Sequence, residues 1–257
     1  MSLFNLARFN LKSSGSITPS NKAVVTFGNV GIDEAVAGIK ILDVIIGAVN
    51  IENDTNPRIV RAGSDYRRRR HGTRDITVIV ELPLNKDGYA DNVRKLRAWA
   101  ESDEPKALKL PAHKNDLIYA SLTGFSEYSL KTWWLPIDLV FTAWDPYFEN
   151  VNENTASIGS SFSIGGSGEP SCRIVHPITE SITDPEWLFE DGKKIKLIGT
   201  FSSGEIEIDL DRLMVYHNGV SAMSKLTLTS RFPHITPGIW LVNGPTGGFF
   251  KWKERWA

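Results

Sequence analysis

Apolar and polar residues alternate along much of the chain, which is the pattern of β-strands with one buried face. The longest example is residues 133–147, W-W-L-P-I-D-L-V-F-T-A-W-D-P-Y. One face of this predicted strand carries Leu135, Ile137, Leu139, Phe141 and Ala143, and the other carries Trp134, Asp138, Val140, Thr142 and Trp144. Pro146 has no N–H for the sheet ladder, so the strand is expected to stop at Asp145.

A second alternating stretch covers residues 75–82 and places Ile76 and Val78 opposite Thr77 and Ile79. Because both faces are largely apolar, we expect this strand in the centre of a sheet or at a contact between subunits. Residues 35–51 predict a longer β-segment interrupted by Gly38 and Gly47, and its small residues also suit packing between subunits.

One segment changes its period from two to that of a helix. In residues 90–102, Val93, Leu96, Trp99 and Ala100 form one apolar stripe, which predicts an amphipathic helix. Asp91 or Asn92 is the expected N-cap, and Pro105 lies just beyond the expected end. Short strands are predicted at 108–110, 117–122 and 125–132.

The second half of the sequence predicts a succession of short strands. Hairpin turns are expected at Asp191-Gly192, as a type I′ turn, and at Asn218-Gly219. Strands are expected at 186–190, 194–198, 205–210, 226–228, 239–242 and 248–256. Residues 149–168 are rich in Asn, Ser and Gly, which indicates a boundary. The expected fold is therefore mainly β: residues 1–147 as a β-rich domain with one α-helix, and residues 148–257 as a β-sandwich or jelly roll.

Composition narrows the function classes. The 257 residues are 41% hydrophobic and 23% charged with a formal net charge of -1, which suits a soluble globular protein and argues against a general nucleic-acid or membrane-surface binder. No signal peptide or membrane span is expected. The single cysteine, Cys172, excludes a disulfide framework, and its predicted strand makes it a buried apolar residue. The histidines show no metal-ligand spacing, and no nucleotide-binding or nucleophile motif is present, so we expect no catalytic residue, cofactor or metal.

Four acids, Glu205, Glu207, Asp209 and Asp211, share one face of a predicted strand. They invite comparison with the paired carboxylates of jelly-roll glycosidases. The alternative is a solvated strand face above an apolar one, and we favour it, since no substrate cleft accompanies the motif.

A dense basic run comprises Arg67, Arg68, Arg69, Arg70 and, after His71, Arg74. Phosphate contact, a solvated loop and an inter-subunit patch are all open, with the last two favoured. The tryptophans also leave two readings. Exposed on a sandwich, Trp187 and Trp240 would stack on sugar rings, whereas buried they would fill the core.

The order of these features resembles the distal tail protein family of siphophages, the long-tailed, non-contractile phages. The family's helix pattern R-x-L-x-x-W is matched by residues 94–99, R-K-L-R-A-W, and its D-P-Y strand end by Asp145-Pro146-Tyr147. An acid-rich strand with a following hairpin (208–219), then 232–238 and a final amphipathic strand complete the resemblance over nearly the whole chain.

The resemblance implies a structural virion protein of the tail tip or baseplate, made in the host bacterial cytoplasm, and no enzyme. It implies a ring-forming N-terminal domain and a galectin-like or carbohydrate-module-like C-terminal sandwich. Six copies would form a ring that joins the tail tube protein to the tail-associated tip protein. Receptor-binding or baseplate proteins would be further partners, and phage DNA would pass only in transit. The interface candidates are then Arg67, Arg68, Arg69, Arg70, Arg74, Ile76 and Val78. A carbohydrate-binding module using Trp187 or Trp240 and a jelly-roll glycosidase remain the alternatives.

Overall fold

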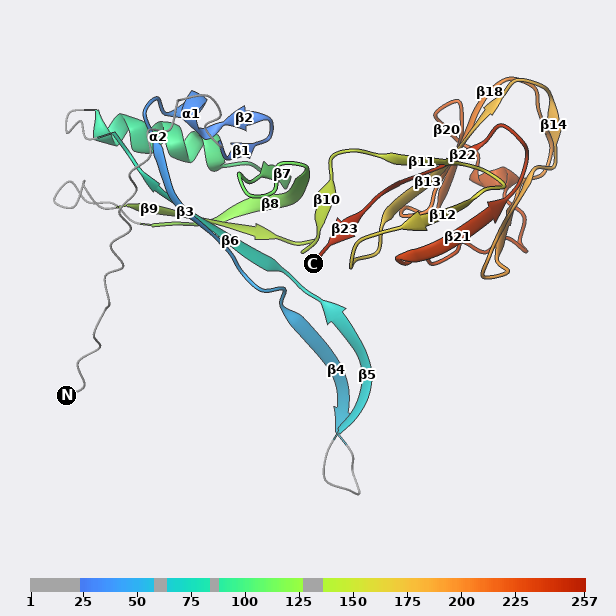
Figure 1. Ribbon diagram of the computed structural model, residues 1–257, viewed down its shortest axis with the longest axis horizontal. Coiled ribbons are helices and arrows are strands. Elements are labelled where there is room, and N and C mark those ends of the chain that lie inside the picture. Colours follow the sequence, from blue (N-terminus) through green and yellow to red (C-terminus); the bar gives the residue numbers. More distant parts are fainter. Residues whose placement is uncertain (1–23, 58–63, 84–87, 127–135) are drawn as a thin grey trace.

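The computed structural model describes residues 24–57, 64–83, 88–126 and 136–257, with side chains described outside 53–70. Figure 1 shows two lobes joined by a narrow junction, with a hairpin leaving the N-terminal lobe. Each lobe has its own apolar core, one drawn from residues 25–148 and the other from residues 162–252. The structure is mainly β, as the sequence predicts.

The N-terminal lobe is built on one antiparallel sheet. Its strands follow the order β2 (Val30–Gly31), β1 (Thr26–Phe27), β7 (Lys106–Lys109), β8 (Asp116–Phe125), β9 (Ile137–Ala143), β6 (Arg74–Glu81) and β3 (Lys40–Ile46). β6 lies between β9 and β3, which confirms its expected central position and explains why both of its faces are apolar. On β9, the predicted buried face is confirmed by Ile137, Leu139, Phe141 and Ala143.

The predicted amphipathic helix is α2 (Tyr89–Ala100), which buries Tyr89, Val93, Leu96 and Ala100. The predicted caps are wrong: Gly88 is the N-cap and has no side-chain hydrogen bond. Asp91 instead pairs with Arg94 one turn further on, at 2.9 Å. A four-residue helix that the pattern did not predict, α1 (Ile32–Ala35), also belongs to this lobe.

Two strands stand apart from the main sheet. β4 (Ile51–Pro57) and β5 (Ser64–His71) pair only with each other, antiparallel, and form the hairpin seen in Figure 1. The predicted β-segment 35–51 therefore divides. Its first residues complete α1, its middle is β3, and its end begins β4.

The C-terminal lobe is a sandwich of two principal sheets. The larger sheet has the order β11 (Asn154–Ser157), β22 (Phe249–Lys253), β13 (Ser171–Ile178), β18 (Gly204–Asp209), β19 (Met214–His217) and β20 (Val220–Ser221). The smaller has β12 (Ser161–Ile164), β21 (Gly238–Asn243), β15 (Glu186–Phe189) and β16 (Lys194–Lys196), and β14 (Ile182–Thr183) pairs with β17 (Thr200–Phe201). Alternate residues such as Ile206, Ile208 and Phe250 fill the space between the sheets.

Turn chemistry explains one success and two errors here. Asn218 and Gly219 have φ of 52° and 75°, the paired positive values of a type I′ turn, and they join β19 to β20. At Asp191-Gly192 the predicted hairpin exists, but only Gly192 has positive φ, so the type I′ assignment is wrong. The predicted strand at 226–228 is also wrong, because Leu226 follows a 3₁₀ turn, η1 (Met223–Lys225), and forms a single bridge to Leu197.

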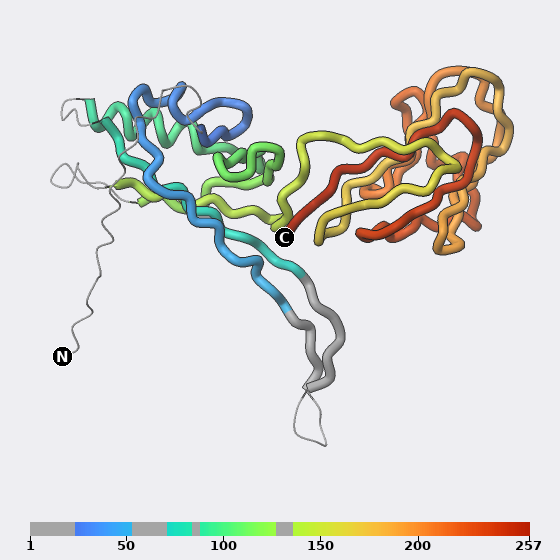
Figure 2. Tube along the Cα trace, viewed as in Figure 1, coloured from blue at the N-terminus to red at the C-terminus, as the bar shows by residue number. Residues whose placement is uncertain are grey.

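The junction between the lobes contains the D-P-Y segment. β10 (Phe148–Asn150) pairs on one side with β8 and on the other with β23 (Arg255–Trp256), so the last residues of the chain return to the junction, as Figure 2 shows. The guanidinium of Arg255 pairs with the Asp145 carboxylate, donates to the Glu169 carbonyl at 3.3 Å and lies over the Tyr147 ring at 5.1 Å. Asp145 and Tyr147 thus hold the end of the C-terminal lobe.

Candidate functional site

Three interface candidates from the sequence lie on β6, and all three are buried within the single chain. Ile76 and Val78 have no exposed surface and belong to the N-terminal core. They therefore present no surface to a partner in the single chain, because the face of β6 that carries them packs in the N-terminal core. Arg74, at the start of β6, is only 6% exposed.

Part of the exposed apolar surface of the N-terminal lobe lies on β3. Leu42 and Ile45 are 49% and 51% exposed. β3 is the last strand of its sheet on this side, so its outer edge has no strand partner among the described residues. A β-bulge between Ile41 and Asp43 shifts the alternation next to Leu42. An exposed apolar edge strand is a surface ready to pair with another chain.

The four consecutive arginines, Arg67 to Arg70, lie on β5, opposite β4. Their side chains fall outside the described part of the structure. The next residue, His71, is exposed, and its Nδ1 hydrogen-bonds the Tyr147 hydroxyl. We call the pair β4 and β5 the arginine hairpin. Its base therefore contacts Tyr147 of the D-P-Y segment at the junction.

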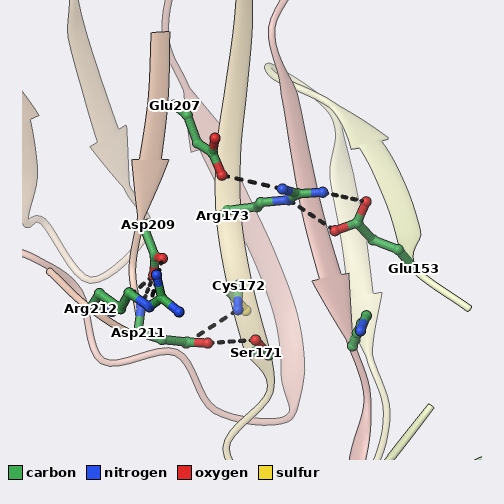
Figure 3. Close-up of a pocket in the computed structure, with 9 residues that line it drawn as sticks. Glu153, Ser171, Cys172, Arg173, Glu207, Asp209, Asp211 and Arg212 are labelled. Carbon is green, nitrogen blue, oxygen red and sulfur yellow. Dashed lines mark hydrogen bonds and ion pairs between the residues drawn. The ribbon is translucent and has the colours of Figure 1, made fainter. Parts of the chain in front are cut away.

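The outer face of the larger C-terminal sheet carries a network of charges, drawn in Figure 3. Arg173 on β13 makes two parallel bonds to Glu153, at 3.0 and 3.1 Å, and a third to Glu207 on β18, at 3.2 Å. These carboxylates outweigh partial burial and raise the pKa of Arg173, with the hydrogen bond to Glu153 as the main cause. Lys251 approaches Glu153 from β22 at 3.8 Å.

Three of the four acids considered for glycoside hydrolysis are engaged in structural contacts on this face (Figure 3), and the fourth, Glu205, is exposed. Glu207 is paired with Arg173, and Asp209 accepts from the backbone N–H groups of Asp211 and Arg212. Asp211 accepts from the Ser171 hydroxyl and from the Cys172 backbone N–H. Burial raises the pKa of Asp211, and these two hydrogen bonds oppose that shift. The arrangement supports the interpretation of a solvated strand face with its own ion pairs.

Cys172 lies under this face on the core side of β13, as expected, and is 3% exposed. Burial, with a smaller contribution from the charge of Asp211, raises the pKa of its thiol strongly. Because the thiolate is the reactive form, this cysteine is unsuited to nucleophilic chemistry.

The two tryptophans considered for sugar stacking are in the sandwich core. Trp187 is completely buried, and Trp240 is 8% exposed with its indole N–H donating to the Thr236 carbonyl at 2.8 Å. Neither offers an open ring face, so the selection of both as carbohydrate-stacking residues is corrected. Alternation places a tryptophan on a strand face, but only the packing of the two sheets shows that the face is internal.

Across the described ranges, no group of three or more His, Cys, Asp or Glu side chains is arranged to hold a metal ion. No helix in those ranges is both long and apolar enough to cross a bilayer.

Comparison with known proteins finds one family match and several similar folds. Residues 169–256 match the family model described as the C-terminal domain of a siphovirus-type tail component. No curated protein matches the sequence. Among solved structures, the chain is similar to the Dit protein (gp 19.1) of SPP1, described as a hub of the adsorption apparatus in phages that infect Gram-positive bacteria. The TM-score is 0.77 at 14% identity, over 91% of this chain and 99% of that chain.

A chain of the phage P2 baseplate, in its activated conformation with Ca, gives a TM-score of 0.40 at 10% identity, over 84% of this chain and 90% of that chain. That similarity is too low to support an argument. The match to SPP1 Dit is a likeness of fold that extends through both lobes.

Proposed function

We propose a structural, non-enzymatic role at the phage tail tip, because residues 169–256 match the family model for the C-terminal domain of a siphovirus-type tail component and the chain has the fold of SPP1 Dit. The resemblance to the distal tail protein family is thereby confirmed. In the proposed role, six copies form a ring between the tail tube protein and the tail-associated tip protein. The outer sandwiches carry or contact the host-adsorption apparatus, and the ring leaves a passage for phage DNA.

The observation that carries this proposal is the exposed apolar edge at β3. Leu42 and Ile45 are half exposed on the last strand of the N-terminal sheet. A soluble single chain is expected to protect such an edge with charge, Pro or a covering element. A ring of identical copies covers it by placing a different surface of the next copy against it, repeated until the rotation closes.

The separation of the two cores supports a division of labour between the lobes. We propose residues 1–147 as the ring-forming part and residues 148–257 as the outward part. The core of the first lobe extends one residue further, to Phe148, and β10 and β23 join the two parts. The self-paired charges on the outer sheet face suit a surface that stays hydrated in the assembled particle.

Native mass spectrometry of the full chain tests the ring. The expected result is a species at six times the chain mass of 28.6 kDa. The double variant Leu42→Lys with Ile45→Lys places two charges at the proposed contact and is expected to leave only monomers. Ile239→Lys is the matched control, since Ile239 is 71% exposed on the C-terminal lobe. A monomeric native chain, or a hexamer that survives the double variant, contradicts the proposed contact.

The arginine hairpin is the second proposed ring element. Its base contacts the junction through His71 and Tyr147, so the hairpin lies next to the connection between the two lobes. The variant with Arg67→Ala and Arg69→Ala is expected to impair ring assembly or phage infectivity. Normal assembly together with normal infectivity would exclude the run from both the ring contact and the DNA passage.

A further inference from the structure

Arg74 is a buried cation for which the described residues supply no ion-pair partner. Its side chain is 6% exposed, and its Nε is buried without a hydrogen-bond partner. The guanidinium lies 5.5 Å from the centroid of the Phe148 ring, which supplies a π-face but no acceptor for its N–H groups. Burial lowers the pKa of Arg74, and the charge interaction with the nearby Tyr147 opposes this shift.

The other arginines near the junction and the sheet face are paired differently. Arg173 contacts two carboxylates, and Arg255 contacts Asp145. No carboxylate within the described residues forms an ion pair with Arg74. Leaving a buried charge unpaired is costly, because a low-dielectric surrounding replaces water without returning its hydrogen bonds. The arrangement around Arg74 is therefore incomplete in the single chain.

A pocket of about 410 Å³ opens beside this arginine. It is lined by Ile46, Arg74, His113, Asp116, Phe148, Trp256 and Ala257. The His113 ring stacks on Phe148, with centroids 4.4 Å apart and planes 9° from parallel. The acidic side chain in the lining, Asp116, faces His113 at 3.7 Å. The pocket thus presents a buried guanidinium, an imidazole and aromatic walls.

We propose that this pocket binds an oxyanion, a carboxylate or a phosphate, on the guanidinium of Arg74. The planar guanidinium matches two oxygens of either group, and a charge-assisted pair in a partly dry pocket is among the stronger polar contacts in proteins. His113 is the second ligand candidate. The pocket straddles the junction, since Arg74 starts β6 of the N-terminal lobe and Trp256 ends β23. A bound anion would therefore link the two lobes.

Two sources of such an oxyanion are considered. One is free phosphate in solution. The other is an acidic side chain of a second copy of the chain, and this source rests on the proposed ring. The phosphate source does not depend on ring formation, so the two ideas can fail separately.

The test titrates inorganic phosphate into the full-length chain at constant ionic strength, followed by thermal unfolding and by the fluorescence of Trp256 and the other tryptophans. The wild-type melting temperature is expected to rise with phosphate. Arg74→Met is expected to bind phosphate at least about tenfold more weakly, the loss of one charge-assisted contact. Without phosphate, Arg74→Met is expected to melt no lower than the wild type, because it removes an unpaired charge.

Arg97→Met is the matched control, because Arg97 is an exposed arginine on α2 in the same lobe. It is expected to respond to phosphate like the wild type. Arg74→Lys keeps the charge and should retain a weaker response, which guards against a folding defect in Arg74→Met.

The second source gives a different result. If phosphate leaves the wild type unchanged, while Arg74→Met abolishes the oligomer in native mass spectrometry and Arg97→Met preserves it, the anion is a carboxylate of a second copy. If Arg74→Met responds to phosphate and assembles as the wild type does, the site is refuted. A clear drop in the phosphate-free stability of both Arg74→Met and Arg74→Lys also refutes it, since Arg74 is then satisfied inside its own chain.

Discussion

The ion pair between Arg255 and Asp145 is predicted to couple the two lobes. The two residues are 110 positions apart, and the pair joins β23 to the segment that follows β9. Arg255 is also bonded to the Glu169 carbonyl and lies over Tyr147, so its position is well defined. We expect the pair to contribute to stability in a double-mutant cycle of Arg255→Gln and Asp145→Asn.

The magnitude follows from the exposure of the two side chains. At contact distance a pair of unit charges is worth about 1 kcal/mol in water and about 4 kcal/mol at an effective dielectric constant of about 20. The Arg255 side chain is 17% exposed, but that of Asp145 is 55% exposed, which places the pair near the solvated limit. The expected coupling energy is about 1 kcal/mol. Arg255→Gln alone should cost about 2 kcal/mol, because it also removes the cation–π contact and weakens the bond to Glu169.

The assay is urea unfolding of the wild type, both single variants and the double variant at low salt and at about 0.5 M NaCl. A solvent-exposed pair on α2, Arg97 with Glu101 at 3.9 Å, provides the control cycle and should couple by no more than about 0.5 kcal/mol. A coupling for Arg255 and Asp145 no larger than this control, or one that is unchanged by salt, would refute the reasoning.

Three further predictions follow from single sites. Gly166→Ala should lower stability by at least about 2 kcal/mol and Gly192→Ala by only about 1 kcal/mol in thermal melts. Both glycines have positive φ, but a Cβ on Gly166 would lie 2.3 Å from the Arg255 carbonyl oxygen, whereas Gly192 is open; equal losses would contradict this. Cys172 should resist a thiol reagent such as DTNB in the native protein and react in urea, because burial raises the pKa of its thiol; rapid native reaction would contradict that burial. Burial lowers the pKa of His176, so the unfolded chain takes up the proton first as the pH falls. The contribution of His176 to the free energy of unfolding should be fully present above about pH 6.5 and should fall by at most about 1.4 kcal/mol per pH unit as the pH is lowered below that value. His176→Gln should reduce this slope. An unchanged slope in the variant would assign the decline to other groups.

Local patterns along the chain were sufficient to predict several of the individual strands, the main helix and one turn. Alternation identified the buried face of β9, and the helical stripe identified α2, because each depends on the period of a single segment. The Asn218-Gly219 turn was also readable, since these two residues accept positive φ at low cost. The short helix α1 was not readable, because four residues contain too little periodicity to distinguish a helix turn from a loop.

Tertiary structure decided which of the apolar positions are exposed and which are buried. Ile76 and Leu42 are both apolar strand residues, yet Ile76 packs in the N-terminal core and Leu42 is half exposed on the edge strand β3. Trp187 and Trp240 satisfied the pattern for a sugar platform, and the second sheet of the sandwich covers them. Alternation predicts that one face of a strand is more apolar than the other, but it does not predict what packs against each face.

The D-P-Y segment shows the same division. The sequence by itself determined that a strand ends before Pro146, because proline cannot continue the ladder, and β9 ends at Ala143. Only the tertiary structure decided that Asp145 meets Arg255 and that Tyr147 meets His71, since these partners come from distant parts of the chain. Only it showed that Arg74, one member of a basic run, is buried beside a pocket at the junction of the lobes. Strand periods and turns arise within a few residues, whereas pairing and burial depend on which distant segments the folded chain brings together.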